Sequence, residues 1–429
     1  MGLCQAIFPR GLRVPRHRAT TAHLCSAFPL VAEGGLGADG VYLGTNVLTG
    51  GAGFAYDPFE AYAAGLVTNP NVLVAGEPGT GKSATAKCLI SRACGVFGRW
   101  VAIADPKGEY LPLAEHLGLD IIRLHPGGTA RLNPLDPGPA GPAVGPEETA
   151  RRQSQMAAAL LGSVLRRDLS PVEDAVVGWA CLHLARTHTG QPTLDDLASV
   201  LADPTKEMAE RARTTPIELA RQIEAATYGL GKLLDRSLRG MFDGPTTVSL
   251  DWSGPGIVLD LSAVHQDPDA LPLVMLCVTA WLQAILARPD GPPRIQVLDE
   301  AWSLLANERT SRYLQSCWKL GRSYGVANVA IVHRLSDLRA QADDGTATAK
   351  VAAGLLADTQ TRVLFRQASD QIPDAKTLLG LTATEAQVLG KLCRGRAIWK
   401  VGDHTAVVQH AIGPGEIAFC DSDARMAAF

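Results

Sequence analysis

The chain has 429 residues, which is enough for two or three domains, and its 46% hydrophobic and 19% charged content is that of a globular protein. Its formal net charge of −3 argues against bulk nucleic-acid binding by the whole chain, although a local basic surface is compatible with this total. Nine cysteines are scattered without a Cys-x-x-Cys pair, so we expect reduced thiols rather than a disulfide or zinc framework.

No uninterrupted apolar run reaches about 18 residues, so we predict no transmembrane segment. The longest candidate, 271–287, contains Pro272, Thr279 and Gln283 and better fits a buried helix. Residues 1–9 lack the apolar centre of a secretory signal. We therefore expect a cytoplasmic protein, with peripheral binding at the inner face of the membrane left open.

The amino-terminal part divides into two regions. Residues 1–34 are a basic lead-in, for which a flexible segment and an arm that contacts a partner or nucleic acid are both open. A glycine-rich region follows at 35–66, where the runs 40–44 and 53–59 predict a small β-hairpin that leads into the nucleotide core.

A complete phosphate-binding loop pattern opens a core predicted over 67–140. The run 72–75 predicts a buried strand, Gly76-x-x-x-x-Gly81-Lys82-Ser83 follows, and 84–92 predicts a helix. In this pattern the glycines bring backbone N–H groups to a polyphosphate, Lys82 reaches the β and γ phosphates, and the Ser83 hydroxyl ligates Mg²⁺. ATP and Mg²⁺ are the predicted ligands. The predicted nucleotide-binding residues are Gly76, Glu77, Pro78, Gly79, Thr80, Gly81, Lys82, Ser83 and Ala84.

Polar residues also follow the next predicted strand, 100–104. This strand leads into Asp105-Pro-Lys-Gly-Glu109-Tyr110, at the edge where open α/β sheets bind ligands. Asp105 and Glu109 are therefore accessory candidates that would orient water or the metal shell. A strand-end turn built by Pro and Gly is the alternative. A third strand is predicted at 120–124.

Between 141 and 244 the pattern changes to helices. Ser170-Pro-Val-Glu173 predicts a capped helix start, Thr193 begins another helix, and Thr215 begins a third that we predict to run through 217–226. We predict an all-helical subdomain inserted into the core. The second part of the core is predicted over 245–429, with strands at 256–261, 294–298, 325–332 and 361–367 and a closing hairpin of 397–401 and 405–412.

The strand predicted at 294–298 runs into Asp299-Glu300, which fits the second motif of a nucleotide site. Asp299 is predicted to hold the Mg²⁺ shell and Glu300 to polarise the attacking water as general base. We therefore predict Glu300 and Lys82 as the catalytic residues. An acidic pair after an apolar run is by itself only a moderately specific sign of a nucleotide site. In a chain that also contains a phosphate loop, it becomes a specific one.

Three residues on later strands are weaker candidates. His333 ends its strand where a γ-phosphate sensor would lie, and an ordinary strand-end histidine is equally open. Strand alternation would place Arg362 and Arg366 on one face, where they are candidates for an arginine finger that reaches a neighbour's nucleotide. Surface charge is the alternative for both arginines.

Four motifs together resemble the HerA–FtsK superfamily of ATPases. They are the phosphate loop, the Asp105–Tyr110 segment, Asn133-Pro-Leu-Asp136 and Asp299-Glu-Ala-Trp302. More narrowly, residues 35–415, including the helical insert, resemble the VirB/TraC-type ATPases of conjugative type IV secretion. The family's large amino-terminal domain is almost wholly missing here, and its usual glutamine sensor corresponds to His333.

The resemblance implies an α/β fold with a RecA-like P-loop NTPase sheet and an inserted all-helical subdomain. It also implies a homo-oligomeric ring, usually a hexamer, at a membrane secretion or conjugation complex. A motor ATPase that moves DNA or protein is the leading hypothesis. A DNA translocase or coupling protein and a non-catalytic, ATP-dependent assembly scaffold are the alternatives. GTP binding is disfavoured because no Asn-Lys-x-Asp string is present.

Overall fold

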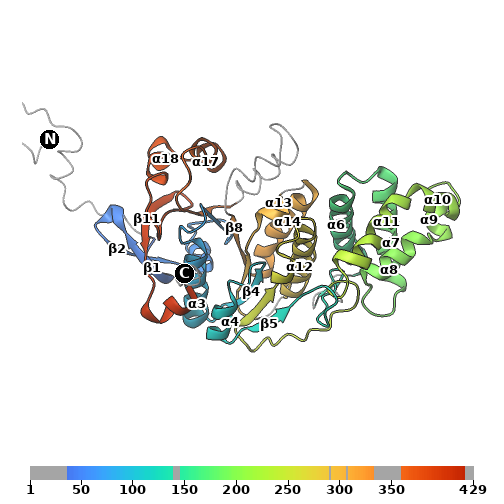
Figure 1. The fold of residues 1–429 in the computed structure, drawn as a ribbon, viewed down its shortest axis with the longest axis horizontal. Coiled ribbons are helices and arrows are strands. Elements are labelled where there is room, and N and C mark those ends of the chain that lie inside the picture. Colours follow the sequence, from blue (N-terminus) through green and yellow to red (C-terminus); the bar gives the residue numbers. More distant parts are fainter. Residues whose placement is uncertain (1–35, 139–144, 289–290, 306–307, 333–358, 421–429) are drawn as a thin grey trace, which may run out of the picture. The chain divides into compact units, whose positions relative to one another are not determined.

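A computed structural model describes residues 36–138, 145–288, 291–305, 308–332 and 359–420. Within these residues eleven strands form one sheet (Figure 1). The strands are β1 (Val41–Asn46), β2 (Ala52–Tyr56), β3 (Val72–Ala75), β4 (Trp100–Asp105), β5 (Asp120–Arg123), β6 (Gly256–Asp260), β7 (Arg294–Leu298), β8 (Val326–Val332), β9 (Thr361–Leu364), β10 (Arg396–Val401) and β11 (His404–His410).

The sheet has a parallel part and an antiparallel part. Its order is β2-β1-β11-β10-β9-β3-β8-β7-β4-β6-β5, with β9 to β5 parallel to their neighbours and β10, β11, β1 and β2 antiparallel. Because parallel strands end at the same edge, the segments that follow β3, β4 and β7 meet there. The predicted RecA-like α/β fold is confirmed.

The central strands are apolar because helices cover them on both faces. In β4, Val101 and Ile103 pack into one hydrophobic cluster, whereas Ala102 and Ala104 pack into another on the opposite face. The first cluster contains residues of α3 (Lys82–Phe97), α4 (Leu111–Leu117) and α19 (Ile417–Cys420). The second contains residues of α12 (Ala270–Leu286) and α14 (Glu308–Gly321).

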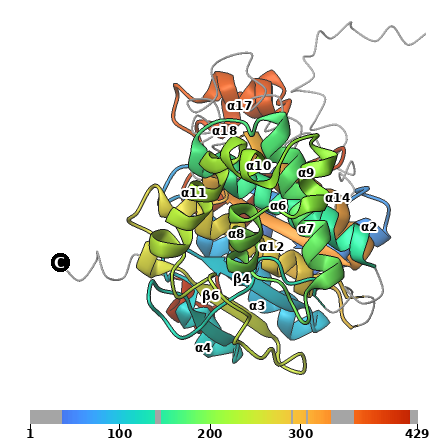
Figure 2. The same ribbon diagram turned by 90° about the vertical axis from the view of Figure 1, so that its right-hand side faces the viewer.

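The helices α6 to α11 lie within the predicted insert (Figure 2). The long helix α6 packs against α12 and α14, so the hydrophobic core of the insert continues into that of the sheet. These helices are α6 (Pro146–Leu165), α7 (Pro171–Thr187), α8 (Leu194–Ala202), α9 (Lys206–Arg211), α10 (Pro216–Gln222) and α11 (Glu224–Lys232).

Local capping explains where the helices of the insert start. The Ser170 side chain accepts from the Glu173 N–H, and the Glu173 carboxylate accepts from the Ser170 N–H, which is the predicted capping box of α7. Thr215 caps α10 as predicted, but the single helix expected over 217–226 is wrong. The backbone of Ile223 leaves the helical region (φ −107°, ψ 11°) while its side chain stays buried, and this separates α10 from α11.

The other described helices are α2 (Pro58–Ala63), α13 (Trp302–Leu305), α17 (Ile372–Leu379) and α18 (Ala383–Leu389). None of the described helices combines the length and the apolar character needed to cross a membrane.

The predicted hairpins are present and belong to the main sheet. β1 and β2 form the amino-terminal hairpin, and β10 and β11 form the closing one. β1 pairs with β11, so the hairpin of β1 and β2 forms the antiparallel edge of the same sheet.

Candidate nucleotide-binding and hydrolysis site

The phosphate loop connects β3 to α3 at the carboxyl edge of the sheet. A Cβ built on Gly76 would lie 2.5 Å from the Phe365 Cβ, so a larger residue at position 76 does not fit. Gly81 has a φ of +108°, which favours glycine, and it has no side chain to cap α3. The first N–H groups of this sixteen-residue helix can therefore be satisfied by an anion, and the helix dipole favours one.

The Lys82 side chain hydrogen-bonds to the backbone of the phosphate loop. Its Nζ donates to the carbonyl oxygens of Gly76 at 2.6 Å and Glu77 at 2.8 Å. Burial lowers the pKa of Lys82 to about 8, and the negative charge of Asp299 opposes this shift. The lysine therefore stays largely protonated at neutral pH, as a cation that binds phosphate must.

Asp299 and Glu300 follow β7 and are both buried, with exposed fractions of 1% and 2%. Burial, followed by the nearby charge of Glu300, raises the pKa of Asp299 to about 7. The Glu300 N–H donates to Asp299 Oδ1 at 2.9 Å. Glu300 has a φ of +54°, a left-handed conformation that a non-glycine residue rarely adopts. Such backbone strain is concentrated at functional sites.

The donor set fits a magnesium nucleotide. The Ser83 hydroxyl and the Asp299 carboxylate are hard oxygen ligands of the kind Mg²⁺ takes, with phosphate oxygens completing its shell. Asp299 and Glu300 lie close enough to Lys82 for their negative charges to oppose the lowering of its pKa by burial.

Asp105 organises the turn that follows β4. Its Oδ1 accepts the N–H groups of Lys107 at 3.2 Å and Glu109 at 3.1 Å, and its Oδ2 accepts that of Tyr110 at 2.8 Å. Burial raises the pKa of Asp105 to about 6, against the lowering effect of these bonds. The contacts favour a turn-forming role for Asp105. The negative charge of Glu109 raises the pKa values of both Lys82 and Asp299. The accessory role of Glu109 stays a prediction.

Lys107 is a site residue that the sequence analysis did not single out. Its Nζ forms an ion pair with Glu300 Oε1. Lys107 lies within the motif 105–110 that carries the family resemblance, so the sequence does contain this residue in a recognisable position. Its contact with Glu300 could be predicted only if β4 and β7 were known to be neighbours, with Ala104 opposite Leu298.

The two candidate finger arginines have contacts within their own chain. Arg362 donates to the carbonyl oxygens of Thr359 at 3.0 Å and Leu379 at 2.6 Å, which favours a structural role. Arg366 lies beyond the end of β9, so its predicted place on the strand is wrong. Its Nε lies 3.2 Å from the Glu77 carboxylate of the phosphate loop. The finger function stays a prediction, and His333 lies outside the described residues.

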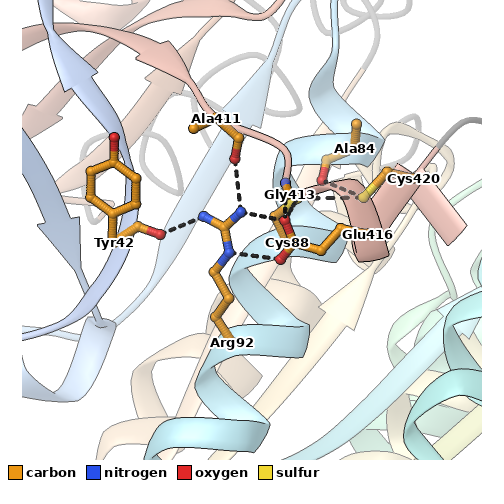
Figure 3. Close-up of polar contacts among 8 residues, drawn as sticks. All are labelled: Tyr42, Ala84, Cys88, Arg92, Ala411, Gly413, Glu416 and Cys420. Atoms are coloured by element: carbon orange, nitrogen blue, oxygen red, sulfur yellow. Dashed lines mark hydrogen bonds and ion pairs between the residues drawn. The ribbon is translucent and has the colours of Figure 1, made fainter. Parts of the chain in front are cut away.

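A carboxyl-terminal segment, residues 411–420, packs against α3. Figure 3 shows Arg92 of α3 in contact with the Glu416 carboxylate and the carbonyl oxygens of Ala411 and Tyr42. Its Nε donates to Glu416 Oε1 at 2.8 Å, and its Nη2 donates to Ala411 at 2.7 Å. These contacts join α3 to β1 and to the residues that follow β11.

The comparisons with known proteins add structural relatives. No protein-family model matches the chain, and no curated protein matches its sequence. The structure is similar to VirB4 of Thermoanaerobacter pseudethanolicus, with a TM-score of 0.70 and 22% sequence identity over 90% of this chain and 100% of that one. The chain therefore has the VirB4 fold.

The plasmid coupling protein TrwB is a second structural relative. Its complex with the ATP analogue ADPNP gives a TM-score of 0.56 and 20% identity over 80% of this chain and 85% of that one. TrwB has also been solved with ADP and Mg²⁺ and with the GTP analogue GDPNP.

Proposed function

We propose that the chain is an ATPase, which hydrolyses ATP to ADP and phosphate with Mg²⁺. The observation that carries this proposal is the convergence of the phosphate loop and Asp299-Glu300 at one edge of a sheet with the VirB4 fold. The structures of TrwB with ADPNP and with ADP and Mg²⁺ support the choice of ligands.

Each site residue has a defined task in this proposal. Lys82 and the N–H groups at the start of α3 would bind the phosphates, and Ser83 and Asp299 would hold the metal ion. Bound Mg²⁺ would neutralise charge that develops on the phosphates. Glu300 is the general base for water in this proposal.

We further propose that the ATPase powers the transfer of DNA or protein in a conjugation or type IV secretion-like system. The VirB4 fold and the helices α6 to α11 support this role, together with the family resemblance of the four motifs. We expect a homo-oligomeric ring, usually a hexamer, located in the cytoplasm or at the inner face of the membrane beside its secretion complex.

A coupling protein or DNA translocase is a second candidate, because TrwB shares the fold over 80% of this chain. Steady-state ATP turnover with single-stranded and double-stranded DNA separates the two candidates. Turnover that rises with DNA favours the translocase, whereas Glu300-dependent turnover that DNA leaves unchanged favours secretion. Because TrwB also has a structure with GDPNP, GTP should be tested beside ATP.

A further inference from the structure

A partly buried ion pair joins the turn after β4 to the turn after β7. The side chain of Glu300 is 3% exposed, and that of its partner Lys107 is 26% exposed. We propose that Lys107 is a positioning residue for ATP hydrolysis, whose ammonium group holds the Glu300 carboxylate in one orientation. This inference rests on the proposed ATPase function.

The backbone that carries Lys107 is fixed by its surroundings. The fully buried Asp105 accepts the N–H of Lys107 itself and those of Glu109 and Tyr110, so one carboxylate holds the whole turn. The Tyr110 side chain is also completely buried. The ammonium group is therefore presented from an anchored turn next to β7.

The partner carboxylate lies in a strained segment. A left-handed conformation is unfavourable for a non-glycine residue, so the neighbouring contacts must hold Glu300 in place. Its N–H bonds to the Asp299 side chain, and the N–H of Ala301 bonds to the carbonyl oxygen of Ile331. These contacts fix the backbone, while Lys107 acts on the carboxylate itself.

The orientation of the Glu300 carboxylate matters for the reaction because a general base must lie within hydrogen-bond reach of the water that it activates. Loss of Lys107 removes the ion pair that fixes this orientation. Lys82 does not replace Lys107 in this role, because the loop carbonyls of Gly76 and Glu77 hold its ammonium group. Loss of Lys107 should therefore slow hydrolysis more than it weakens nucleotide binding.

The kinetic test compares wild type with Lys107→Met and Lys107→Arg. Lys107→Met should lower kcat by about 10-fold or more, with KM and the affinity for a fluorescent ATP analogue changed by less than about 3-fold. Lys107→Arg should restore part of kcat because it keeps the charge. The control Lys206→Met makes the same change at an exposed lysine of α9 and should behave as wild type.

A double-mutant cycle with Glu300→Gln tests the pair itself. In nucleotide-free protein, Lys107→Met should lower the Tm in the wild-type background and have little effect beside Glu300→Gln, because a neutral glutamine needs no cation. The effects of the two substitutions on kcat should likewise not add. Should Lys107→Met fail to fold, Lys107→Gln provides the same comparison with a polar side chain.

The outcomes separate this inference from the function on which it rests. Wild-type turnover with an equally active Lys107→Met variant, or additive effects on the Tm, would overturn the positioning role alone. Absence of turnover in the wild type would overturn the ATPase proposal and the positioning role together, while the Tm cycle would still report whether the pair forms. Coupled Tm values and a selective loss of kcat would establish the role.

Discussion

Arg92 of α3 makes several polar contacts with the carboxyl-terminal segment, beside those of Cys88 and Ala84, and Arg92→Ala should loosen that segment (Figure 3). The substitution removes a paired contact with the Glu416 carboxylate and bonds to two carbonyl oxygens. The side chains of Arg92 and Glu416 are each 18% exposed, so solvent screens the pair only in part. With about 1–2 kcal/mol for the ion pair and about 0.5–1 kcal/mol for each carbonyl bond, the loss is about 2–4 kcal/mol.

The assay combines thermal unfolding with amide hydrogen exchange over residues 411–420. Arg92→Ala should lower the Tm and speed exchange in α19, because local opening of this segment becomes easier. The control Arg151→Ala breaks an exposed pair with Glu148, whose side chains are 51% and 34% exposed. We expect about 0.5 kcal/mol or less from it. Equal exchange and equal Tm values for the two variants would refute the reasoning.

Two further predictions concern the phosphate loop, and one concerns His410 of β11. Gly76→Ala should destabilise the loop by about 1–3 kcal/mol through overpacking and weaken nucleotide binding in a fluorescence titration, whereas Gly95→Ala, which meets open space on α3, should do neither. Burial lowers the pKa of His410 to about 4, while its Nε2 accepts from Trp399 at 2.9 Å. Below about pH 6.5 the unfolded chain therefore binds a proton at His410 that the folded chain does not bind. The free energy of unfolding should consequently decrease as the pH falls from about 6.5 to about 4, and this decrease should be smaller in His410→Gln. Lys82→Ala should abolish most nucleotide binding in an equilibrium titration, and retained affinity would contradict its phosphate contact.

The sequence could predict those parts of the site that depend on neighbours along the chain. The phosphate loop is encoded by local glycines between a strand and a helix, and Asp299-Glu300 by an apolar run that ends in acids. The capping box of α7 was equally local, since Ser170 and Glu173 bond to each other.

Features that depend on strand order were not predictable in this way. The Lys107–Glu300 pair requires β4 beside β7, and the place of the first hairpin in the main sheet requires β11 beside β1. The short β9 ends before Arg366, because its partner β3 ends at Ala75 and the phosphate loop begins there. The helix break at the buried Ile223 has no proline or glycine at residues 222–224 to predict it.

The measurement that tests the central claim most directly is steady-state ATP turnover by wild type and Glu300→Gln, with nucleotide affinity measured on the same samples. If the phosphate loop and Asp299-Glu300 form one hydrolysis site, Glu300→Gln should keep wild-type affinity for ATP within about 3-fold and lose at least about 100-fold in kcat. Wild-type turnover in Glu300→Gln would contradict the assignment of the general base. Absence of turnover in the wild type would contradict the ATPase itself.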